Sequence, residues 1–392
     1  LGQSAADGLK FILKEDFVPK GADKWLFTLA PMAAVVPAFI AWAVIPWGGS
    51  IEISEPIVLF GNEIVSTGKA LVAVADLNIG LVYLLAVAGV GVYGVILGGW
   101  ASNSKYSFLG GMRASASMIS YEIPMGTAIL SILLIAGSLQ PSVIVEEQAA
   151  NGWFIFYQPV AAILFFVCIL AEANRAPFDN AEAEQELVGG FHTEYSAMRF
   201  AMFFLGEYTH MVVSSAFFVV LFLGGYHLAI PFLPAEVPGL HLLSPEATGL
   251  LAAIAKTKVF MVKVILIVCF MMLIRWTLPR IRFDQVMKLA WNTLIPIGIL
   301  QVVATSLMVF FDLAEMSITG MGVMFLMNLA LFVLIMALLG PGTMSSTRNR
   351  RIPLAGSRFN PLPGERVVTG PVDPVASADL MDHKTASAST VH

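Results

Sequence analysis

Residues 77–104 read LNIGLVYLLAVAGVGVYGVILGGWASNS, a stretch that contains no Asp, Glu, Lys or Arg. A helix needs about 20 apolar residues to cross the hydrocarbon core of a bilayer, and this run is longer than that. Inside hydrocarbon every backbone N–H and C=O must be paired within the protein, so the run is expected to be a helix rather than a strand. Residues 289–311 and 318–347 are equally free of charge, which indicates further spans.

The composition of the whole chain is that of a membrane protein. Hydrophobic residues make up 57% of the 392 residues and charged residues only 12%, which is more apolar than a soluble domain requires. The net charge of −5 and the lack of a basic patch argue against nucleic-acid binding. Cys168 and Cys269 stand alone inside apolar runs, which predicts buried thiols and no metal site. Without a dinucleotide, phosphate-loop or haem-attachment motif, we expect no cofactor bound by this chain itself.

Apolar runs along the chain predict an all-α integral membrane protein with eight transmembrane helices in this sequence. Pro31, Pro37, Pro124 and Pro296 fall inside these runs, and each is expected to bend its helix. The expected spans are 24–47, 77–100, 117–138, 153–172, 200–225, 258–278, 288–311 and 320–341.

The distribution of Lys and Arg predicts the orientation of these spans, because cytoplasmic loops carry an excess of both residues. One set of connections holds most of the basic residues, including all those of the C-terminal stretch. The opposite set holds little more than Lys69, Lys256 and Lys258. We therefore expect both ends of this sequence to be cytoplasmic, together with the acidic loop 173–199.

The two ends differ in character from the transmembrane domain, which is expected over residues 24–341. Charged and apolar residues separate onto opposite helical faces near the start, so residues 1–23 predict an amphipathic helix lying in the membrane surface. Whether this helix only anchors the chain or also lines a cavity is left open. Residues 342–392 are rich in Pro, Gly, Ser and Arg without apolar periodicity, and predict a flexible cytoplasmic tail.

The most polar segment lies between two expected spans. Residues 172–196 read EANRAPFDNAEAEQELVGGFHTEYS and hold six carboxylates and one arginine. Most acidic loops are solvated surface, but Glu172 stands at the membrane end of its helix. Arg175 and Asp179 flank the turn fixed by Pro177, where we expect a local ion pair. The segment therefore predicts a place where water, protons or a polar headgroup meets the membrane.

Ionisable side chains also occur within or at the edges of the spans, where charge is expensive and usually functional. Asp76, Glu122, Glu172 and Glu207 come from different parts of the sequence. Such carboxyls can accept and release protons in turn, which predicts a proton relay. The alternative is that Glu122 and Glu207 only join helices by hydrogen bonds. His210 shares a helical face with Glu207, but a satisfied core histidine is the interpretation we favour for it.

These residues resemble the motifs of the quinone-site membrane subunit of bacterial NADH-quinone oxidoreductase, respiratory complex I. The resemblance rests on residues 172–196, with 98–106, 120–122 and 279–284 resembling further signatures of that family. It covers roughly residues 1–340. The first transmembrane helix of the family is missing from this sequence, so we expect nine spans in the full protein.

The resemblance implies a subunit of an NADH:quinone oxidoreductase, a proton-translocating enzyme of the bacterial inner membrane. Membrane quinone is the implied substrate, and flavin and iron–sulfur clusters are implied in partner subunits of a hydrophilic arm. Neighbouring membrane subunits are implied to pump the protons, and lipid surrounds the chain. The residues implied in proton relay and coupling are Asp76, Glu122, Glu172, Glu182, Glu184, Glu186 and Glu207. Those implied in the quinone chamber are Arg113, Arg175, Phe178, Asp179, Phe191, Glu194 and Arg199.

Three other functions remain as alternatives. The membrane subunit of an energy-converting hydrogenase-type complex has the same ancestry but needs no quinone chamber, and the acidic signature favours the quinone enzyme. A secondary ion transporter usually shows an internal repeat with interrupted helices, and the sequence contains no convincing repeat. A purely structural membrane anchor has no need of several buried ionisable groups.

Overall fold

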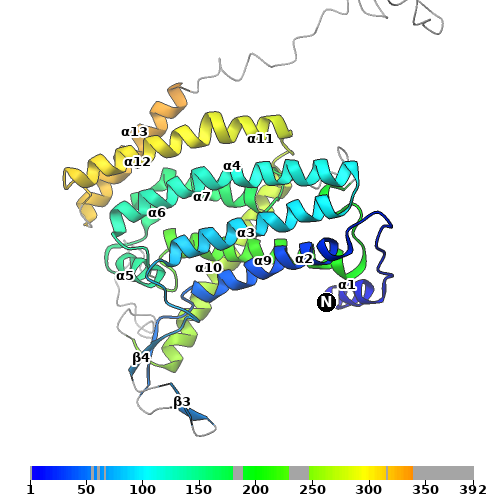
Figure 1. Ribbon diagram of the computed structural model, residues 1–392. Helices are drawn as coiled ribbons and strands as arrows, with labels where there is room; N and C mark the ends of the chain where they lie inside the picture. Colours follow the sequence, from blue (N-terminus) through cyan, green and yellow to red (C-terminus); the bar gives the residue numbers. More distant parts are fainter. Residues whose placement is uncertain are drawn as a thin grey trace, which may run out of the picture. The chain divides into compact units, whose positions relative to one another are not determined.

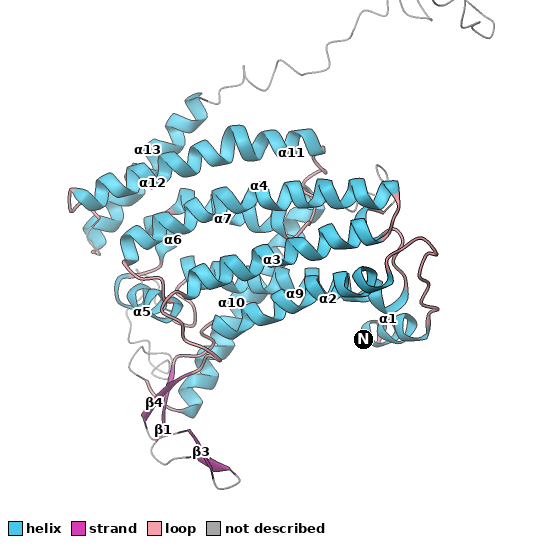
Figure 2. Cartoon of the chain, in the orientation of Figure 1, coloured by secondary structure: helices cyan, strands magenta, loops and turns pink. Residues whose placement is uncertain are grey.

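The structure is a computed structural model of the chain, and it describes residues 2–53, 57–59, 62–65, 68–179, 189–228, 247–314 and 317–338. These residues fold almost entirely into helices (Figures 1 and 2). The chain up to Ile335 forms one compact unit, and the residues from Met336 onward form a second. The predicted tail 342–392 lies outside the described residues.

Long apolar helices dominate the fold, as the sequence predicts. Within the described residues, six helical segments are long and apolar enough to cross a membrane. Two shorter apolar helices, α7 (Pro159–Glu172) and α13 (Ile318–Leu338), occupy the positions of two other predicted spans. A mostly helical membrane fold is therefore confirmed, while the number of eight spans stays a prediction. The long helices are α2 (Lys24–Ala41), α3 (Gly80–Ala101), α4 (Lys105–Ala136), α9 (Ala197–Phe222), α10 (Leu250–Thr277) and the continuous run of α11 (Phe283–Leu289), η4 (Ala290–Leu294) and α12 (Ile295–Phe310).

The local sequence explains where several of these helices begin or change. The carboxylate of Asp23 caps α2 by accepting from the backbone N–H of Trp25 at 3.0 Å, because the first N–H groups of a helix have no internal partner. Helix α4 ends where Gly137 adopts a φ of 65°, a left-handed conformation that glycine tolerates. The turn η4 is a π-helix that ends at Leu294, two residues before Pro296, where the sequence predicted a bend.

The connection between α2 and α3 contains strands, which the all-α prediction did not include. Residues Ser50–Ile53 (β1) pair antiparallel with Gly68–Leu71 (β4), so that Ser50 lies opposite Leu71. Residues Ile57–Leu59 (β2) pair with Asn62–Val65 (β3) in the same way. In β1 isoleucine alternates with Ser50 and Glu52 in a stretch too short to span a membrane, a pattern that suits a short strand.

Shorter helices complete the described fold and connect the long ones. Helix α5 (Pro141–Asn151), which follows α4, was not among the expected spans, whereas η1 (Trp42–Val44) extends α2 within the predicted span 24–47. The N-terminal helix α1 (Gln3–Leu13) packs against α9 through a contact between the rings of Phe11 and Phe200, whose centroids are 6.0 Å apart. The remaining short elements are α6 (Phe154–Tyr157) and η2 (Gly190–His192).

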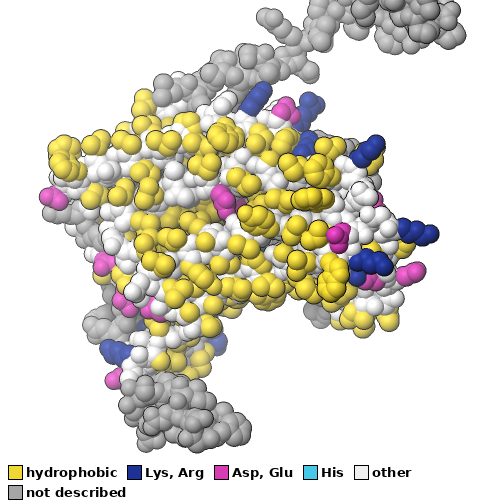
Figure 3. All heavy atoms as spheres, viewed as in Figure 1, with side chains coloured by type: hydrophobic (Ala, Val, Ile, Leu, Met, Phe, Trp, Pro, Cys, Tyr) yellow, Lys and Arg dark blue, Asp and Glu magenta, His cyan; other side chains and the backbone are white. Residues whose placement is uncertain are grey.

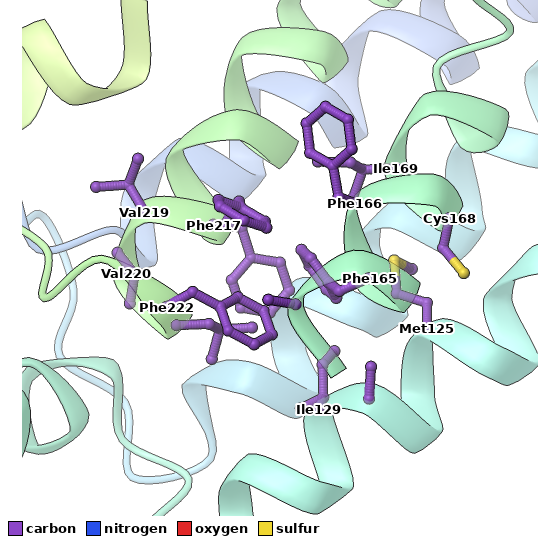
Figure 4. Packing of buried hydrophobic residues seen from close by; sticks show 14 of the residues in the cluster. Met125, Ile129, Phe165, Phe166, Cys168, Ile169, Phe217, Val219, Val220 and Phe222 are labelled. Atoms are coloured by element: carbon purple, nitrogen blue, oxygen red, sulfur yellow. The ribbon is translucent and has the colours of Figure 1, made fainter. Parts of the chain in front are cut away.

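Helix α7 lies at the centre of the packing. Its Phe165 ring lies 5.5 Å from that of Phe217 and 5.7 Å from that of Phe222, both on α9 (Figure 4). By contrast, α10, α12 and α13 carry many exposed large hydrophobic residues, and hydrophobic side chains cover much of the face shown in Figure 3. An apolar outer surface of this size is what a helix bundle surrounded by lipid or by other membrane subunits presents.

Glycine allows α2 and α3 to pack closely. A Cβ atom on Gly94 of α3 would lie 2.6 Å from the backbone nitrogen of Ala34 on α2, which is too short for any side chain. Small residues at such crossings let helix backbones approach one another in a membrane. This close packing holds α2 and α3 beside α9, where the candidate site lies.

Candidate functional site

The carboxylate of Glu172 is buried at the last residue of α7. Its side chain is 5% exposed, and its Oε1 lies 3.3 Å from Nε2 of His210 on α9. Burial of a carboxylate in an apolar bundle is costly unless a partner compensates. The histidine that the sequence analysis favoured as a satisfied core residue is thus the immediate neighbour of a predicted relay carboxyl.

A second polar pair lies one helical turn from this one. Nη2 of Arg175 is 3.8 Å from Oε2 of Glu207, and both side chains are largely buried. The guanidinium also stacks over the ring of Tyr208, with its Cζ 4.3 Å from the ring centroid, an arrangement that stabilises a cation. Arg175, which the sequence analysis expected to pair with Asp179, therefore reaches back to α9.

Two small cavities of about 50 Å³ each lie around these pairs. They share Glu172, His210 and three small residues of α2 and α3. The first extends along α9 past Phe217, and its wall includes Met125 and Ile169, which Figure 4 labels. The second extends in the opposite direction, and Glu207 lines it. Each cavity has room for roughly three to five waters, at about 10–15 Å³ of such volume per water.

Glu122 lies on α4 in the middle of the bundle and is half-buried. Its Oε1 is so close to Gly89 of α3 that a Cβ atom on that glycine would lie 2.6 Å away. The neighbouring Tyr121 is fully buried and donates to the backbone oxygen of Val286 at 3.0 Å. Helix α4 therefore carries one predicted relay carboxyl against α3 and holds α11 with the adjacent residue.

Asp76 lies apart from the other predicted relay carboxyls. It is exposed in the turn before α3, where it accepts hydrogen bonds from Gln140 and from Ser142 Oγ at 3.0 Å. Neither cavity is lined by it. The structure thus brings Glu172 and Glu207 to one place and puts Asp76 at the opposite end of α3 from the acidic segment.

Arg199, a predicted chamber residue, and its neighbours Ser196 and Tyr195 connect the acidic segment to the start of the chain. Arg199 lies 3.4 Å from Asp16 and over the ring of Phe27, while Ser196 Oγ accepts from the backbone N–H of Phe17 at 3.1 Å. Tyr195 stacks on the same Phe27, with ring centroids 4.0 Å apart.

The region around Tyr195 excludes solvent. Tyr195 is 6% exposed, and its hydroxyl donates to the backbone oxygen of Gly98 at 3.4 Å. Burial raises the pKa of Tyr195 above its usual range, because desolvation disfavours the charged form. Phe191 packs beside it against Phe203, with ring centroids 5.2 Å apart, and lines the second cavity.

The rest of the predicted chamber residues face α4 and α11. Phe178 is buried with its ring 5.5 Å from that of Tyr121. Asp179 accepts from Arg280 at 2.6 Å, so the far side of the proline turn is joined to the segment before α11. Arg113 of α4 lies 4.8 Å from the ring of Phe283. These contacts make one continuous structure from the acidic segment, α4 and α11.

For four of the predicted site residues, the structure gives less detail or none. Glu194 is half-buried in the turn after η2. Glu182, Glu184 and Glu186 lie outside the described residues. Within the described part of the chain no group of three His, Cys, Asp or Glu side chains is placed to hold a metal ion.

Sequence reasoning missed three residues at this site. His210 was recognisable from its spacing of three residues from Glu207, which puts both on one face of a helix. Tyr208 follows Glu207 directly, yet its stacking with Arg175 depends on how the acidic segment folds back. Asn174 lines the second cavity, and no pattern in the sequence distinguishes it from an ordinary turn asparagine.

The chain is similar to proteins of known family. A family model described as NADH dehydrogenase matches residues 1–306. The chain is 46% identical over 310 residues to an NADH-quinone oxidoreductase H subunit of Geobacter sulfurreducens, an alignment that covers 78% of this chain and 82% of that protein. It is 43% identical over 303 residues to the corresponding H subunit of Cytophaga hutchinsonii, covering 77% and 82%. It is 40% identical over 303 residues to that of Flavobacterium johnsoniae, covering 77% and 81%.

Proposed function

Since this chain belongs to the NADH dehydrogenase family, with relatives named as H subunits of NADH-quinone oxidoreductase, we propose that its buried carboxyls couple quinone reduction to proton movement. In this proposal the chain forms part of the quinone chamber of a multi-subunit enzyme. The redox groups, flavin and iron–sulfur clusters, belong to partner subunits. Quinone is the substrate, and neighbouring membrane subunits carry the protons across.

The observation that carries the proposal is the grouping of Glu172, His210, Arg175 and Glu207 around two water-sized cavities. A proton moves through a dry bundle only where titratable groups and waters follow one another at hydrogen-bond spacing. A charge that appears near the acidic segment changes the electrostatic energy of every buried carboxyl within several ångströms. The grouping therefore suits a subunit that converts a charge change at its mouth into a proton shift inside the bundle.

The quinone chamber is proposed on the side of the acidic segment. Arg175, Phe178 and Asp179 belong to a turn that is held by α4, α9 and the segment before α11. Phe191, Glu194 and Arg199 follow on the other side of residues 180–188. Aromatic rings and guanidinium groups together suit a substrate with a planar, polar head and an apolar tail. The carboxylates Glu182, Glu184 and Glu186 are proposed to pass charge from this chamber inward.

The membrane orientation is part of the proposal. The acidic segment, the N-terminal helix α1 and the tail 342–392 are placed on the cytoplasmic side of a bacterial inner membrane. Figure 3 shows Lys and Arg gathered near α1 and the start of α11, with a few beside β4 at the other end. An excess of basic residues marks the cytoplasmic end of a bundle. Helix α1 exposes Leu9, Ile12 and Leu13, which suits a helix lying in the membrane surface.

The test is a substitution of Glu122, which removes a titratable proton and little else. Glutamine is nearly the same shape as glutamate, so Glu122→Gln should spare assembly of the complex. NADH oxidation by a hydrophilic electron acceptor should remain at the wild-type rate, while proton pumping coupled to quinone reduction falls severalfold or more. Glu146→Gln is the matched control, because Glu146 is an exposed carboxyl on α5. If the Glu122 variant pumps normally at full turnover, Glu122 contributes only a structural hydrogen bond and carries no proton.

A further inference from the structure

The two cavities described above are stacked along α9 and meet at one pair of side chains. Both are lined by Glu172 and His210, and by Ala34, Ala88 and Gly91 of α2 and α3. Beyond this shared wall, the second cavity adds two polar side chains, Asn174 and Glu207, to a mostly apolar lining. The first continues past residues that are almost all apolar, from Pro37 to Phe217. The shared pair therefore stands between a cavity that holds a second carboxyl and one that does not.

His210 lies beside one carboxyl of the site and on the same helical face as the other. Its Nε2 lies 3.3 Å from Glu172 Oε1, which is close to hydrogen-bond distance. Glu207 precedes it by three residues on α9, so the two side chains lie on the same helical face. Both line the second cavity, which is large enough for water to connect them.

The hydrogen bonding of His210 points to a role beyond packing. Both ring nitrogens are buried and neither makes a hydrogen bond to a described residue, although Nε2 lies 3.3 Å from Glu172 Oε1. A buried imidazole nitrogen without a partner costs free energy, and a water in the adjoining cavity can satisfy it. A histidine between a carboxyl and a water has one nitrogen for each of them.

From this geometry we propose that His210 carries protons between Glu172 and the Arg175–Glu207 pair. The inference rests on the proposed coupling function and names a specific carrier for it. As the O–H bond of Glu172 breaks, an N–H bond forms at Nε2 and the ring becomes an imidazolium. The N–H bond at Nδ1 then breaks to a cavity water, which passes a proton to the carboxylate of Glu207. The ring is left with its proton on Nε2, and a flip of the ring exchanges the places of the two nitrogens, so that the unprotonated one again faces Glu172 and the N–H faces the cavity water; the sequence of steps is reversible.

The charged and titratable groups around His210 agree with this direction of transfer. Glu172 faces His210 from α7. Glu207 lines the second cavity, with Arg175 beside it. Glu122 lies across the bundle on α4, against α3. The cavity-lining residues of α2 and α3 are Ala, Pro, Leu, Val and Gly. Because Arg175 belongs to the acidic segment, a shift of its guanidinium changes the charge balance at Glu207 directly. His210 is the residue through which that change reaches Glu172.

The experiment compares His210→Asn and His210→Ala in the assembled complex, reconstituted in vesicles. Asparagine keeps polar hydrogen-bonding atoms but cannot carry a proton, and alanine leaves space for added imidazole. We expect both variants to oxidise NADH normally with a hydrophilic acceptor and to lose severalfold or more of their proton pumping. Added imidazole should restore pumping to the alanine variant and leave the asparagine variant unchanged. Thr209→Ala, one residue away on the same helix, is the control and should pump at the wild-type rate.

Two results overturn the proposal. Normal pumping by His210→Asn means that the position needs only a polar side chain. If both variants lose pumping and added imidazole restores none of it, His210 positions other groups and does not carry the proton. The Glu122→Gln variant, measured alongside, separates these failures from a failure of the proposed function. If Glu122→Gln also pumps normally, the proposed coupling function is wrong. If Glu122→Gln loses pumping, the coupling function stands, and only the role of His210 as the carrier is refuted.

Discussion

At the scale of single residues, the site is formed by side chains whose partners lie far away in the sequence. Arg175 stands four residues before Asp179, and a local pair across Pro177 was the simplest expectation. The guanidinium lies against Glu207 and Tyr208 of α9, and Asp179 lies against Arg280. Both pairs join segments distant in the sequence, so each fixes the acidic segment onto the bundle.

A substitution at Arg175 should therefore affect quinone use itself. Arg175→Ala removes the cation that faces Glu207 and the stacking partner of Tyr208, so the turn at Pro177 loses its attachment to α9. We expect a raised apparent KM for a short-chain quinone, by severalfold or more, and weaker inhibition by quinone-site ligands. Arg175→Lys should recover part of the loss, because lysine keeps the charge without the planar stacking surface.

Steady-state kinetics of the complex in detergent measure this effect without any proton gradient. Lys14→Ala, which removes an exposed cation near α1, serves as the control and should keep wild-type kinetics. Glu186→Gln should act on coupling more than on quinone affinity. Unchanged quinone kinetics and inhibitor sensitivity in Arg175→Ala would show that the turn does not shape the chamber.

At the scale of helices, the structure contains a helix interruption that the sequence pattern did not predict. The apolar run 153–172 predicted one continuous helix, but the chain forms α6 and α7 with an interruption at Gln158. A break inside an apolar bundle leaves backbone groups without partners. Asn328 of α13 donates to the backbone oxygen of Tyr157 at 3.0 Å, and Gln158 donates to Thr305 of α12 at 2.9 Å. The amide of Gln301 joins this buried network by donating to Gln158 and to Asn328.

Loss of Asn328 should destabilise this break. Asn328→Leu fills the space but removes the donor to Tyr157 and the acceptor for Gln301. Each buried polar group left without a partner costs about 1–3 kcal/mol. We expect a lower midpoint temperature for loss of quinone reductase activity from the detergent-solubilised complex, and less assembled enzyme. Asn78→Leu, at an exposed asparagine before α3, is the matched control. Equal thermal midpoints for the two variants would mean that the network contributes no stability.

Helices show where sequence reasoning succeeds and where it stops. Runs without charge located the long helices, because hydrocarbon forbids most alternatives, but α4 begins 12 residues before the predicted span 117–138 and α10 begins 8 residues before the predicted span 258–278. The interruption at Gln158 escaped notice because its compensating amides, Gln301 and Asn328, come from helices far along the chain. His210 was assigned to packing for the same reason, since Glu172 reaches it only after α7 and α9 come together. Partners from distant segments are what a single sequence does not specify.

At the scale of the whole molecule, alternating helices put the acidic segment at one end of the bundle, while Glu122 and His210 lie near the middle of α4 and α9. Helices α2, α4 and α9 begin at the end where α3 and α7 finish, so Lys24, Lys105 and Arg199 lie at the end that also holds Glu172. The strands β1 and β4 lie at the opposite end (Figure 1). This arrangement gathers Lys24, Lys105 and Arg199 at the end of the acidic segment, and that grouping of basic residues is the basis for the proposed orientation.

Accessibility of single cysteines tests that orientation. The exposed residues Lys20 and Gln285 belong to the end that carries the acidic segment, and Val74 and Ala150 belong to the other. Cysteines at Lys20 and Gln285 should react with a membrane-impermeant maleimide only from the cytoplasmic side, and those at Val74 and Ala150 only from outside. Ser142 is unsuitable as a labelling site because it is 5% exposed and bonded to Asp76. The native Cys269 is exposed on α10, so it is replaced by alanine in every variant.

The physical reason for the expected pattern is that basic residues are held on the cytoplasmic side during insertion. Residues at one end of an alternating bundle must therefore share a side. Intact cells and inverted vesicles provide the two directions of labelling, and disrupted membranes show that every cysteine can react. If Lys20 and Val74 sites react from the same side, α2 does not cross the membrane and the predicted number of spans falls. If all four sites react with reversed sidedness, the bundle is intact but inverted, and the acidic segment cannot face a cytoplasmic redox arm.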